Sequence, residues 1–233
     1  MNQSDAALRD LVSTTELEAS VAHLCGIGEK VSGTEEERKA CDFITSRLKA
    51  WGYTPTVHTF ESYISAPRSA KLSIHAGGKT VTVPAVGVAF GLSTGPDGIT
   101  EDVVFVGPGT DADYVGKDVA GKIVLVSKLP SPNNAVAAAA HGARGMICMS
   151  AGHQRHKMII TPVWGTPEFD QAKSIPRVHV VSIAKTDGDP VIEMLKAGPV
   201  SVARTGPAFS ISTTGSPSVL AIDTTCTRGM LFA

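Results

Sequence analysis

Four side chains that could bind a metal ion or take part in catalysis lie within a short stretch of the sequence: His141, Cys148, His153 and His156. Imidazole and thiolate groups are common zinc ligands, and His153 and His156 are three residues apart. However, these residues fall across a predicted strand end and a glycine-flanked loop, and the first carboxylate after them is Glu168. Loop histidines that face solvent or a neighbouring domain are therefore favoured over a metal site.

Other motifs for catalysis or cofactor binding are missing. No G-x-S-x-G sequence surrounds a serine, and the glycines of Gly87–Gly98 and Gly107–Gly109 are not followed by the Lys-Ser/Thr of a phosphate loop. The scattered cysteines form no C-x-x-C pair, and Cys148 lies in an apolar run typical of an inert core thiol. We therefore predict no catalytic, cofactor-binding or metal-ligating residue, and no cofactor.

The composition excludes some classes of partner. The chain has 233 residues and a formal net charge of −1, so it has no basic field that would favour nucleic acid or an anionic membrane. Hydrophobic residues make up 42% and aromatic residues 5%, which predicts an aliphatic core in one large or two small domains. The polar start, Met1 to Asp10, does not resemble a signal peptide, so we expect a cytoplasmic protein without membrane contact.

The centre of the sequence predicts two parallel strands joined by a helix. Ile123–Val126 and Met146–Met149 are continuous apolar runs, the pattern of strands buried on both faces. Between them, Ala135–Ala140 is nearly all alanine, and either Asn133 or Asn134 can cap this helix. The pattern therefore indicates a βαβ unit in an α/β fold.

Two segments of this unit resemble the protease-associated (PA) domain. Asp118–Val126 has the Asp-x-x-Gly-Lys-Ile-x-Leu-Val pattern of that family, and Ala139–Ile147 has its alanine-rich helix end followed by Gly-Ala-x-Gly and an apolar strand. Gly142 is expected to end the helix. The resemblance implies a mixed PA-type β sheet or barrel with flanking helices, acting as a binding or interaction module.

The first sixty residues predict two helices and a strand. Thr15 and Thr34 each begin a capping box. Thr54–Phe60 alternates apolar and polar residues as a strand does. Each helix carries an apolar stripe, formed by Leu17, Val21 and Leu24 in the first and by Ala40, Ile44, Leu48 and Trp51 in the second.

This block has a resemblance of its own. Val31–Glu37, Gly52-Tyr53 and Val57–Phe60 are similar to the start of the zinc aminopeptidase family that includes aminopeptidase Y and glutamate carboxypeptidase relatives. A PA domain is often inserted after that strand in the family. The resemblance implies that this block packs on a catalytic sheet, so a chain without that sheet is expected to self-associate through it.

The remaining segments complete the predicted PA domain. The expected strands are Ala70–His75 and Thr80–Val83 joined by Gly77-Gly78, then Asp102–Val106, Val178–Ile183 and Val200–Ala203, and a helix runs from Asp189-Pro190 to Gly198. Gly87–Gly98 and Ala151–Pro176, which contains Trp164-Gly165-Thr166-Pro167, are expected to be long irregular loops.

The zinc-aminopeptidase resemblance does not extend to metal ligands. That family uses a His-x-Asp, a Glu-Glu pair and a later His, all after the PA insert, whereas the last histidine here is His179. We predict three regions: 1–64, the start of a zinc-peptidase-like domain; 65–207, the PA domain; and 208–233, an irregular tail that is frame-shifted or ends early, with one short strand at Val219–Ile222.

Three readings of function stay open at this point. In the first, the chain is inactive as encoded and acts as a substrate lid or a peptide or protein interaction module, with a peptide or a catalytic domain as its partner. In the second, it is the N-terminal part of a zinc-dependent exopeptidase that is active only with its missing catalytic half. In the third, it is a free-standing PA protein that binds through Ala151–Pro176. The reading frame after Thr205 would distinguish a broken gene from a stand-alone module.

Overall fold

The protein is described by a computed structural model over residues 12–59, 64–67, 69–94, 97–161, 173–205, 211–212 and 218–222. The chain divides into two compact units, one formed by Met1–Ser62 with Thr213–Ala233 and the other by Tyr63–Ser212. Each unit is treated separately below. No described helix has the combined length and hydropathy of a transmembrane span.

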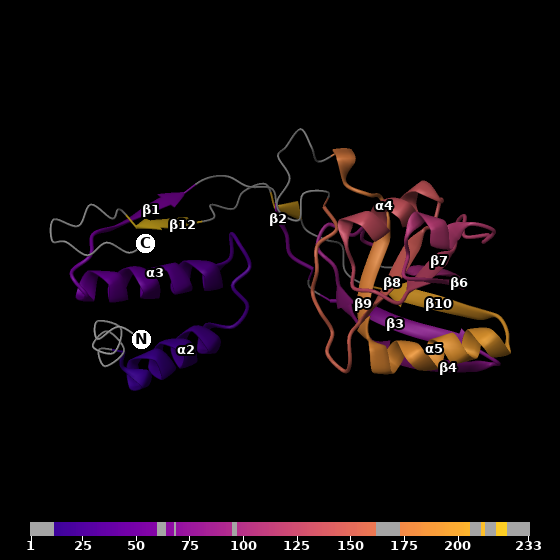
Figure 1. Ribbon diagram of the computed structural model, residues 1–233, viewed down its shortest axis with the longest axis horizontal. Coiled ribbons are helices and arrows are strands. Elements are labelled where there is room, and N and C mark those ends of the chain that lie inside the picture. The colour runs from indigo at the N-terminus through magenta and orange to yellow at the C-terminus, as the bar shows by residue number, and fades with distance from the viewer. Residues whose placement is uncertain are drawn as a thin grey trace, which may run out of the picture. The chain divides into compact units, whose positions relative to one another are not determined.

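The second unit is built on an eight-stranded mixed sheet (Figure 1). The strand order is β4-β3-β10-β6-β7-β8-β9-β5, and β6, β7, β8 and β9 are parallel neighbours. Because β4 at one end of this order also contacts β9 near the other end, the sheet curls toward a barrel. The strands are β3 (Lys71–Ala76), β4 (Lys79–Pro84), β5 (Val86–Gly87), β6 (Ile99–Gly107), β7 (Ile123–Val126), β8 (Gly145–Ser150), β9 (His179–Ala184) and β10 (Val200–Thr205).

The predicted βαβ unit is confirmed, and one detail of it is corrected. β7 and β8 are joined by α4 (Pro132–Ala140) and pair in parallel. The helix cap is Ser131, not Asn133 or Asn134: the Ser131 Oγ accepts from the Asn134 N–H at 3.3 Å, and the Asn134 Oδ1 accepts from the Ser131 N–H at 2.8 Å. Pro132, with its fixed φ, suits the first helical position, so the cap is the residue directly before it, Ser131.

Gly142 ends α4 as predicted, with a positive φ of 76°. The Gly142 N–H donates to the Ala139 carbonyl at 3.0 Å, and the Ala143 N–H donates to the Ala138 carbonyl at 2.9 Å. This pair of bonds is a Schellman motif, which satisfies carbonyls that the helix end would otherwise leave open.

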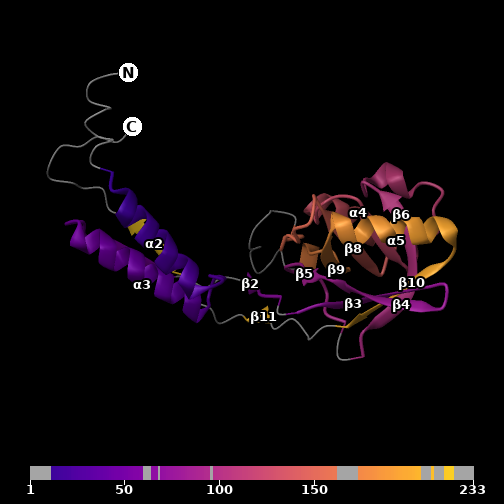
Figure 2. The ribbon, with the colours of Figure 1, turned by 90° about the horizontal axis from the view of Figure 1, so that it is seen from below.

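Strands β7, β8 and β9 are buried on both faces, and each face has its own core. Val124 and Val126 of β7 join a cluster with alanines of α4 and with Tyr114. Ile123 and Leu125 point the other way, into a cluster with β3, β10 and α5 (Lys185–Ala197). Figure 1 shows α4 and α5 on opposite sides of these strands, and in Figure 2, seen from below, α5 lies in front of them. The alternation of one strand between two cores explains why its sequence is continuously apolar.

The hairpin of β3 and β4 is also confirmed. Ala76 pairs with Lys79, and the turn residues Gly77 and Gly78 have φ values of 55° and 73°. Positive φ at both central residues fits a two-residue turn that matches the twist of the strands. The predicted strands Asp102–Val106 and Val200–Ala203 lie within the longer β6 and β10, and Val178–Ile183 corresponds to β9, which begins and ends one residue later.

Two predictions about loops and helix starts are wrong in part. The segment Gly87–Gly98 holds the end of β5 and an isolated bridge between Ala89 and Ile159, so it is not wholly irregular. The predicted helix start at Asp189 is also wrong, because α5 begins at Lys185, directly after β9, and Pro190 lies inside it. Strand β9 leads into the helix without a loop, and Pro190 then only removes the bond that its N–H would have made to Thr186.

The first unit contains two helices and a two-stranded ribbon. The helices are α2 (Thr14–Ile27) and α3 (Glu35–Ala50), and β1 (Pro55–Thr59) pairs antiparallel with β12 (Ser218–Ile222). Thr34 caps α3 as predicted, whereas α2 is capped by Ser13 rather than Thr15. The short strand predicted at Val219–Ile222 is confirmed as β12. Within the second unit, the two-residue strands β2 (Ile64–Ser65) and β11 (Ile211–Ser212) pair with each other.

The α/β fold class predicted from the sequence is confirmed. The prediction for the tail stays open beyond residue 222, and the Trp164–Pro167 segment lies outside the described residues. The domain boundaries at 64 and 207 also stay predictions.

Replacing Gly142 by Ala should lower the free energy of unfolding of the second unit by about 1–2 kcal/mol, because an L residue resists a left-handed backbone. A Cβ at Gly142 would meet Ala120 at an ordinary 3.6 Å, so the loss is conformational rather than steric. Native-state hydrogen exchange of the β7 amides measures the change. Gly198→Ala is the matched control, because Gly198 also follows a helix but has an extended φ of 162° and open space around it. Equal losses in the two variants would contradict this account.

Candidate functional site

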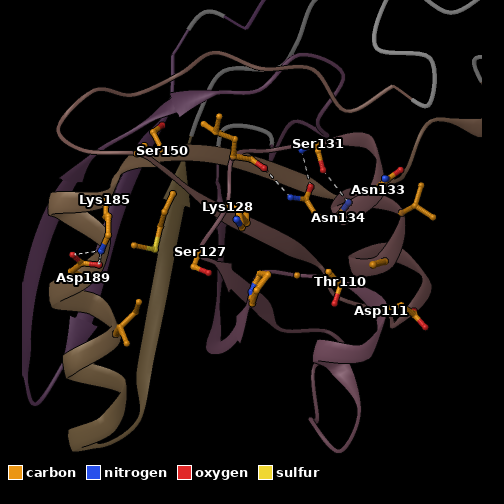
Figure 3. A pocket seen from close by; sticks show the side chains of 18 of the residues that line it. Thr110, Asp111, Ser127, Lys128, Ser131, Asn133, Asn134, Ser150, Lys185 and Asp189 are labelled. Atoms are coloured by element: carbon orange, nitrogen blue, oxygen red, sulfur yellow. Dashed lines mark hydrogen bonds and ion pairs between the residues drawn. The ribbon is translucent and has the colours of Figure 1, made fainter.

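The second unit has a large cleft at the carboxyl ends of its parallel strands. Its volume is about 1080 Å³, and it is lined by the residues that follow β6, β7 and β8, by one side of α4 and by the first turns of α5 (Figure 3). In α/β sheets this edge is the usual place for ligands, because loops and helix starts converge there around an opening between the connections. The cleft is therefore the candidate functional site.

One wall of the cleft is α4. Asn133, Val136 and Ala140 are exposed on it, and Ala135 and Ala138 face the sheet and are fully buried. Alanine side chains let the helix lie close to the strands, so the wall stands near the strand ends. The Asn134 amide also donates to the Leu129 carbonyl at 2.9 Å, which ties the start of the helix to the loop after β7.

The floor of the cleft is formed by Met149 and Ser150 at the end of β8. The Ser150 hydroxyl lies 3.2 Å from the Ser182 hydroxyl and accepts the His156 N–H at 3.1 Å. Gly188 of α5 lies against Met149, and a Cβ there would be 2.7 Å from the Met149 Cε. A glycine at this position lets α5 approach the floor closely, and the buried hydroxyls of the floor already have partners.

Most of the charges around the cleft are neutralised locally. The Lys185 Nζ lies 2.6 Å from a carboxylate oxygen of Asp189, and the Asp111 carboxylate lies 2.8 Å from the His141 Nε2. Lys128, which lies between Lys185 and Asp111 in Figure 3, forms no ion pair with the described residues. The lining thus combines apolar walls with one lysine, Lys128, that can pair with a negatively charged ligand.

The structure does not bring the four candidate metal ligands together. His141 binds Asp111 and stacks on Tyr114, with ring centroids 4.7 Å apart. Cys148 is fully buried, and burial raises the pKa of its thiol, so the prediction that it lies in the core is confirmed. His153 and His156 are exposed on the loop after β8. Within the described ranges no three His, Cys, Asp or Glu side chains are placed to hold a metal ion.

The residues that line the cleft were not singled out by the sequence analysis. Lys128, Asn133 and Lys185 have no motif, and only their positions after predicted strands distinguish them. A rule based on topology, that ligands bind beyond the carboxyl ends of parallel strands, could have indicated Lys128 because it directly follows the apolar run Ile123–Val126. Lys185 was not recognised, because the helix that it begins was predicted to start at Asp189.

Comparisons with known proteins place this unit in a family. Residues 81–191 match the PA domain family model, so the predicted PA domain is confirmed. No curated protein matches the sequence.

The fold resembles those of bacterial aminopeptidases. An aminopeptidase from Aneurinibacillus sp. strain AM-1 has a TM-score of 0.60 at 23% identity, covering 87% of this chain and 45% of that one. The zinc aminopeptidase BSAP from Bacillus subtilis gives 0.59 at 19% identity, covering 86% and 44%. A peptidase M28 precursor from Shewanella amazonensis SB2B gives 0.60 at 18%, covering 86% and 48%. This chain spans less than half the length of each.

Removing the cap of α4 should weaken the wall of the cleft. We expect Ser131→Ala to lower the free energy of unfolding of the second unit by about 1 kcal/mol, because the Asn134 N–H loses its acceptor. Asn133→Ala is the control, since Asn133 is exposed and its side chain has no hydrogen bond with the described residues. Hydrogen exchange of the β7 and β8 amides reports both changes. A larger loss of unfolding free energy for Asn133→Ala than for Ser131→Ala would mean that Asn133 caps the helix, as the sequence predicts.

Proposed function

We propose, from the PA domain that residues 81–191 form, that this chain is a non-catalytic peptide-binding module, and that its cleft holds an extended peptide segment. In this role the domain acts as a lid that captures substrate for a zinc aminopeptidase-like catalytic domain. The single observation that carries the proposal is the cleft of about 1080 Å³ at the carboxyl ends of β6, β7 and β8.

The size and lining of the cleft favour a peptide over a smaller ligand. The volume is at or above the upper end of the range for sites that take drug-sized molecules, roughly 300–1,000 Å³. Leu129, Val136 and Met149 supply apolar surface for side chains, and Lys128 and Asn133 supply polar groups that can orient a backbone. The Ser150 hydroxyl is bonded to Ser182 and to the His156 N–H rather than to a general base.

The available cation also indicates which peptides bind best. Lys128 has no ion pair with the described residues, whereas Lys185 is held by Asp189. A peptide carboxylate near Lys128 would gain an interaction of about 0.2–1 kcal/mol at this exposed position. We therefore expect a modest preference for peptides with one acidic residue among apolar ones.

Filling the cleft should abolish peptide binding. The probe is a fluorescein-labelled apolar hexapeptide with one central Glu, titrated with the full chain and followed by anisotropy. We expect Ala140→Phe to weaken binding by at least about tenfold, which corresponds to about 1.4 kcal/mol, because the ring would occupy the space beside α4.

The matched control for this titration is Ala197→Phe. Ala140 and Ala197 are each the exposed last residue of a helix, but Ala197 does not line the cleft. Ala197→Phe should bind as the unchanged chain does. Equal binding by Ala140→Phe and the unchanged chain, or no binding by either, would refute the proposal.

A second candidate function is the N-terminal part of a zinc-dependent exopeptidase that needs further polypeptide for activity. The observation in its favour is the apolar surface of the first unit: Leu17 and Val21 are 56% and 60% exposed, and Trp51 is 61% exposed. The described residues contain no set of zinc ligands, so no catalytic step through zinc is derived for them.

The same surface predicts self-association of the chain when nothing else covers it. Exposed apolar patches of a few hundred Å² promote association, so sedimentation velocity should show species larger than a monomer. Leu17→Lys with Val21→Lys should shift the population toward monomer. Val115→Lys, a change at a 79% exposed residue of the other unit, is the control and should have no effect. A monomeric unchanged chain would argue against the second candidate.

A further inference from the structure

A buried arginine lies at the opposite edge of the sheet from the cleft. Arg204 is near the end of β10, where it pairs with Leu72 of β3 and with Ile99 at the start of β6. Its side chain follows Val200 and Val202 on the same face of the strand and is only 5% exposed. Arginine is rarely buried to this extent without an anionic partner, because removing its charge from water is costly.

The hydrogen bonds of Arg204 are too few for its donors. One guanidinium nitrogen, Nη1, lies 3.5 Å from the Leu92 carbonyl, at the outer limit for a hydrogen bond. The Nε is buried and has no partner among the described residues. Burial lowers the pKa of Arg204 to about 10, but the group still stays charged at neutral pH.

The carbonyl that Arg204 faces is held in place by other groups. The Leu92 N–H donates to the Val178 carbonyl at 2.9 Å, and the Leu92 carbonyl also lies 3.0 Å from the His179 Nδ1. One backbone oxygen thus serves both a guanidinium and an imidazole. The other N–H groups of Arg204 have no acceptor among the described residues.

The surroundings carry an excess of positive charge. Glu101, a carboxylate near the start of β6, is already paired with Arg144. His179 has a lowered pKa, mainly because of burial and in part because Arg204 and Arg144 repel a proton there. His179 and Arg204 share the Leu92 carbonyl, and the His179 N–H donates to the Arg144 carbonyl at 3.2 Å. No ion pair joins Arg204 to a described carboxylate.

We propose that Arg204, with the Leu92 carbonyl and His179 beside it, is a recognition site for one carboxylate, carried by an acidic side chain of a polypeptide that packs on the amino-terminal edge of β6 and β9. A carboxylate beside the guanidinium would compensate its charge and accept from its Nη donors, as the planar fork allows. This site lies at the edge opposite the cleft and does not depend on the peptide-binding proposal.

The first test asks whether Arg204 is unpaired in the isolated chain. Arg204→Met keeps the volume and removes the charge, so it should stabilise the second unit and slow native-state hydrogen exchange of the β9 and β10 amides by about fivefold or more. Faster exchange in this variant would mean that Arg204 already has its partner, and the proposal would fail. Arg144→Met is the matched control and should not slow exchange, because Arg144 is paired and 48% exposed at its side chain.

The second test asks whether the missing partner is a carboxylate. The probes are N-acetyl-glutamate amide and its neutral isostere N-acetyl-glutamine amide at equal ionic strength. The glutamate probe should slow exchange of the β9 and β10 amides in the unchanged chain and in Arg144→Met by at least about twofold near its dissociation constant, and have no effect in Arg204→Met. A response equal to that of the glutamine probe, or retained in Arg204→Met, would overturn the proposal.

Discussion

Three adjacent parallel strands, β7, β8 and β9, are buried on both faces, and the rest of the second unit depends on this constraint. Along β7 every side chain is at most 2% exposed, so water is excluded from both sides of the sheet and helices must cover each of them. Parallel neighbours cannot be joined by tight turns, so every crossover must travel back over one face. In this chain α4 forms such a crossover on one face, and α5 covers the other after the last parallel strand.

The two ends of these strands therefore differ in chemistry. At the carboxyl ends the chain diverges into α4 and α5, which leaves a cleft with apolar walls and Lys128 between them. At the amino-terminal ends the strands begin close to β10, and the buried Arg204 closes the core there. The carboxyl ends thus border an open cleft with few unsatisfied hydrogen-bonding groups. The amino-terminal ends hold a guanidinium with unsatisfied donors and little free space around it. A binding module can use both ends for different partners.

The sequence predicts the parts of this fold that depend on local pattern. Ile123–Val126 and Ala135–Ala140 are recognisable because burial on two faces and close helix packing each demand a narrow set of side chains. The start of α5 was missed because Pro190 usually marks a helix start, whereas here Lys185 follows β9 without a loop. The cleft residue Lys128 and the buried Arg204 could not be predicted, since their importance comes from which strands are neighbours, and that order is set by long-range packing.

The central claim is that the carboxyl ends of the parallel strands form a peptide site. Amide chemical-shift mapping of the ¹⁵N-labelled chain with an unlabelled apolar hexapeptide tests it most directly. The account predicts that the shifted amides cluster at Thr110, Lys128, Ala140 and Lys185, which lie around one cleft although they are far apart in the sequence. Shifts confined to β3, β4 or α2, or spread evenly over the chain, would contradict it.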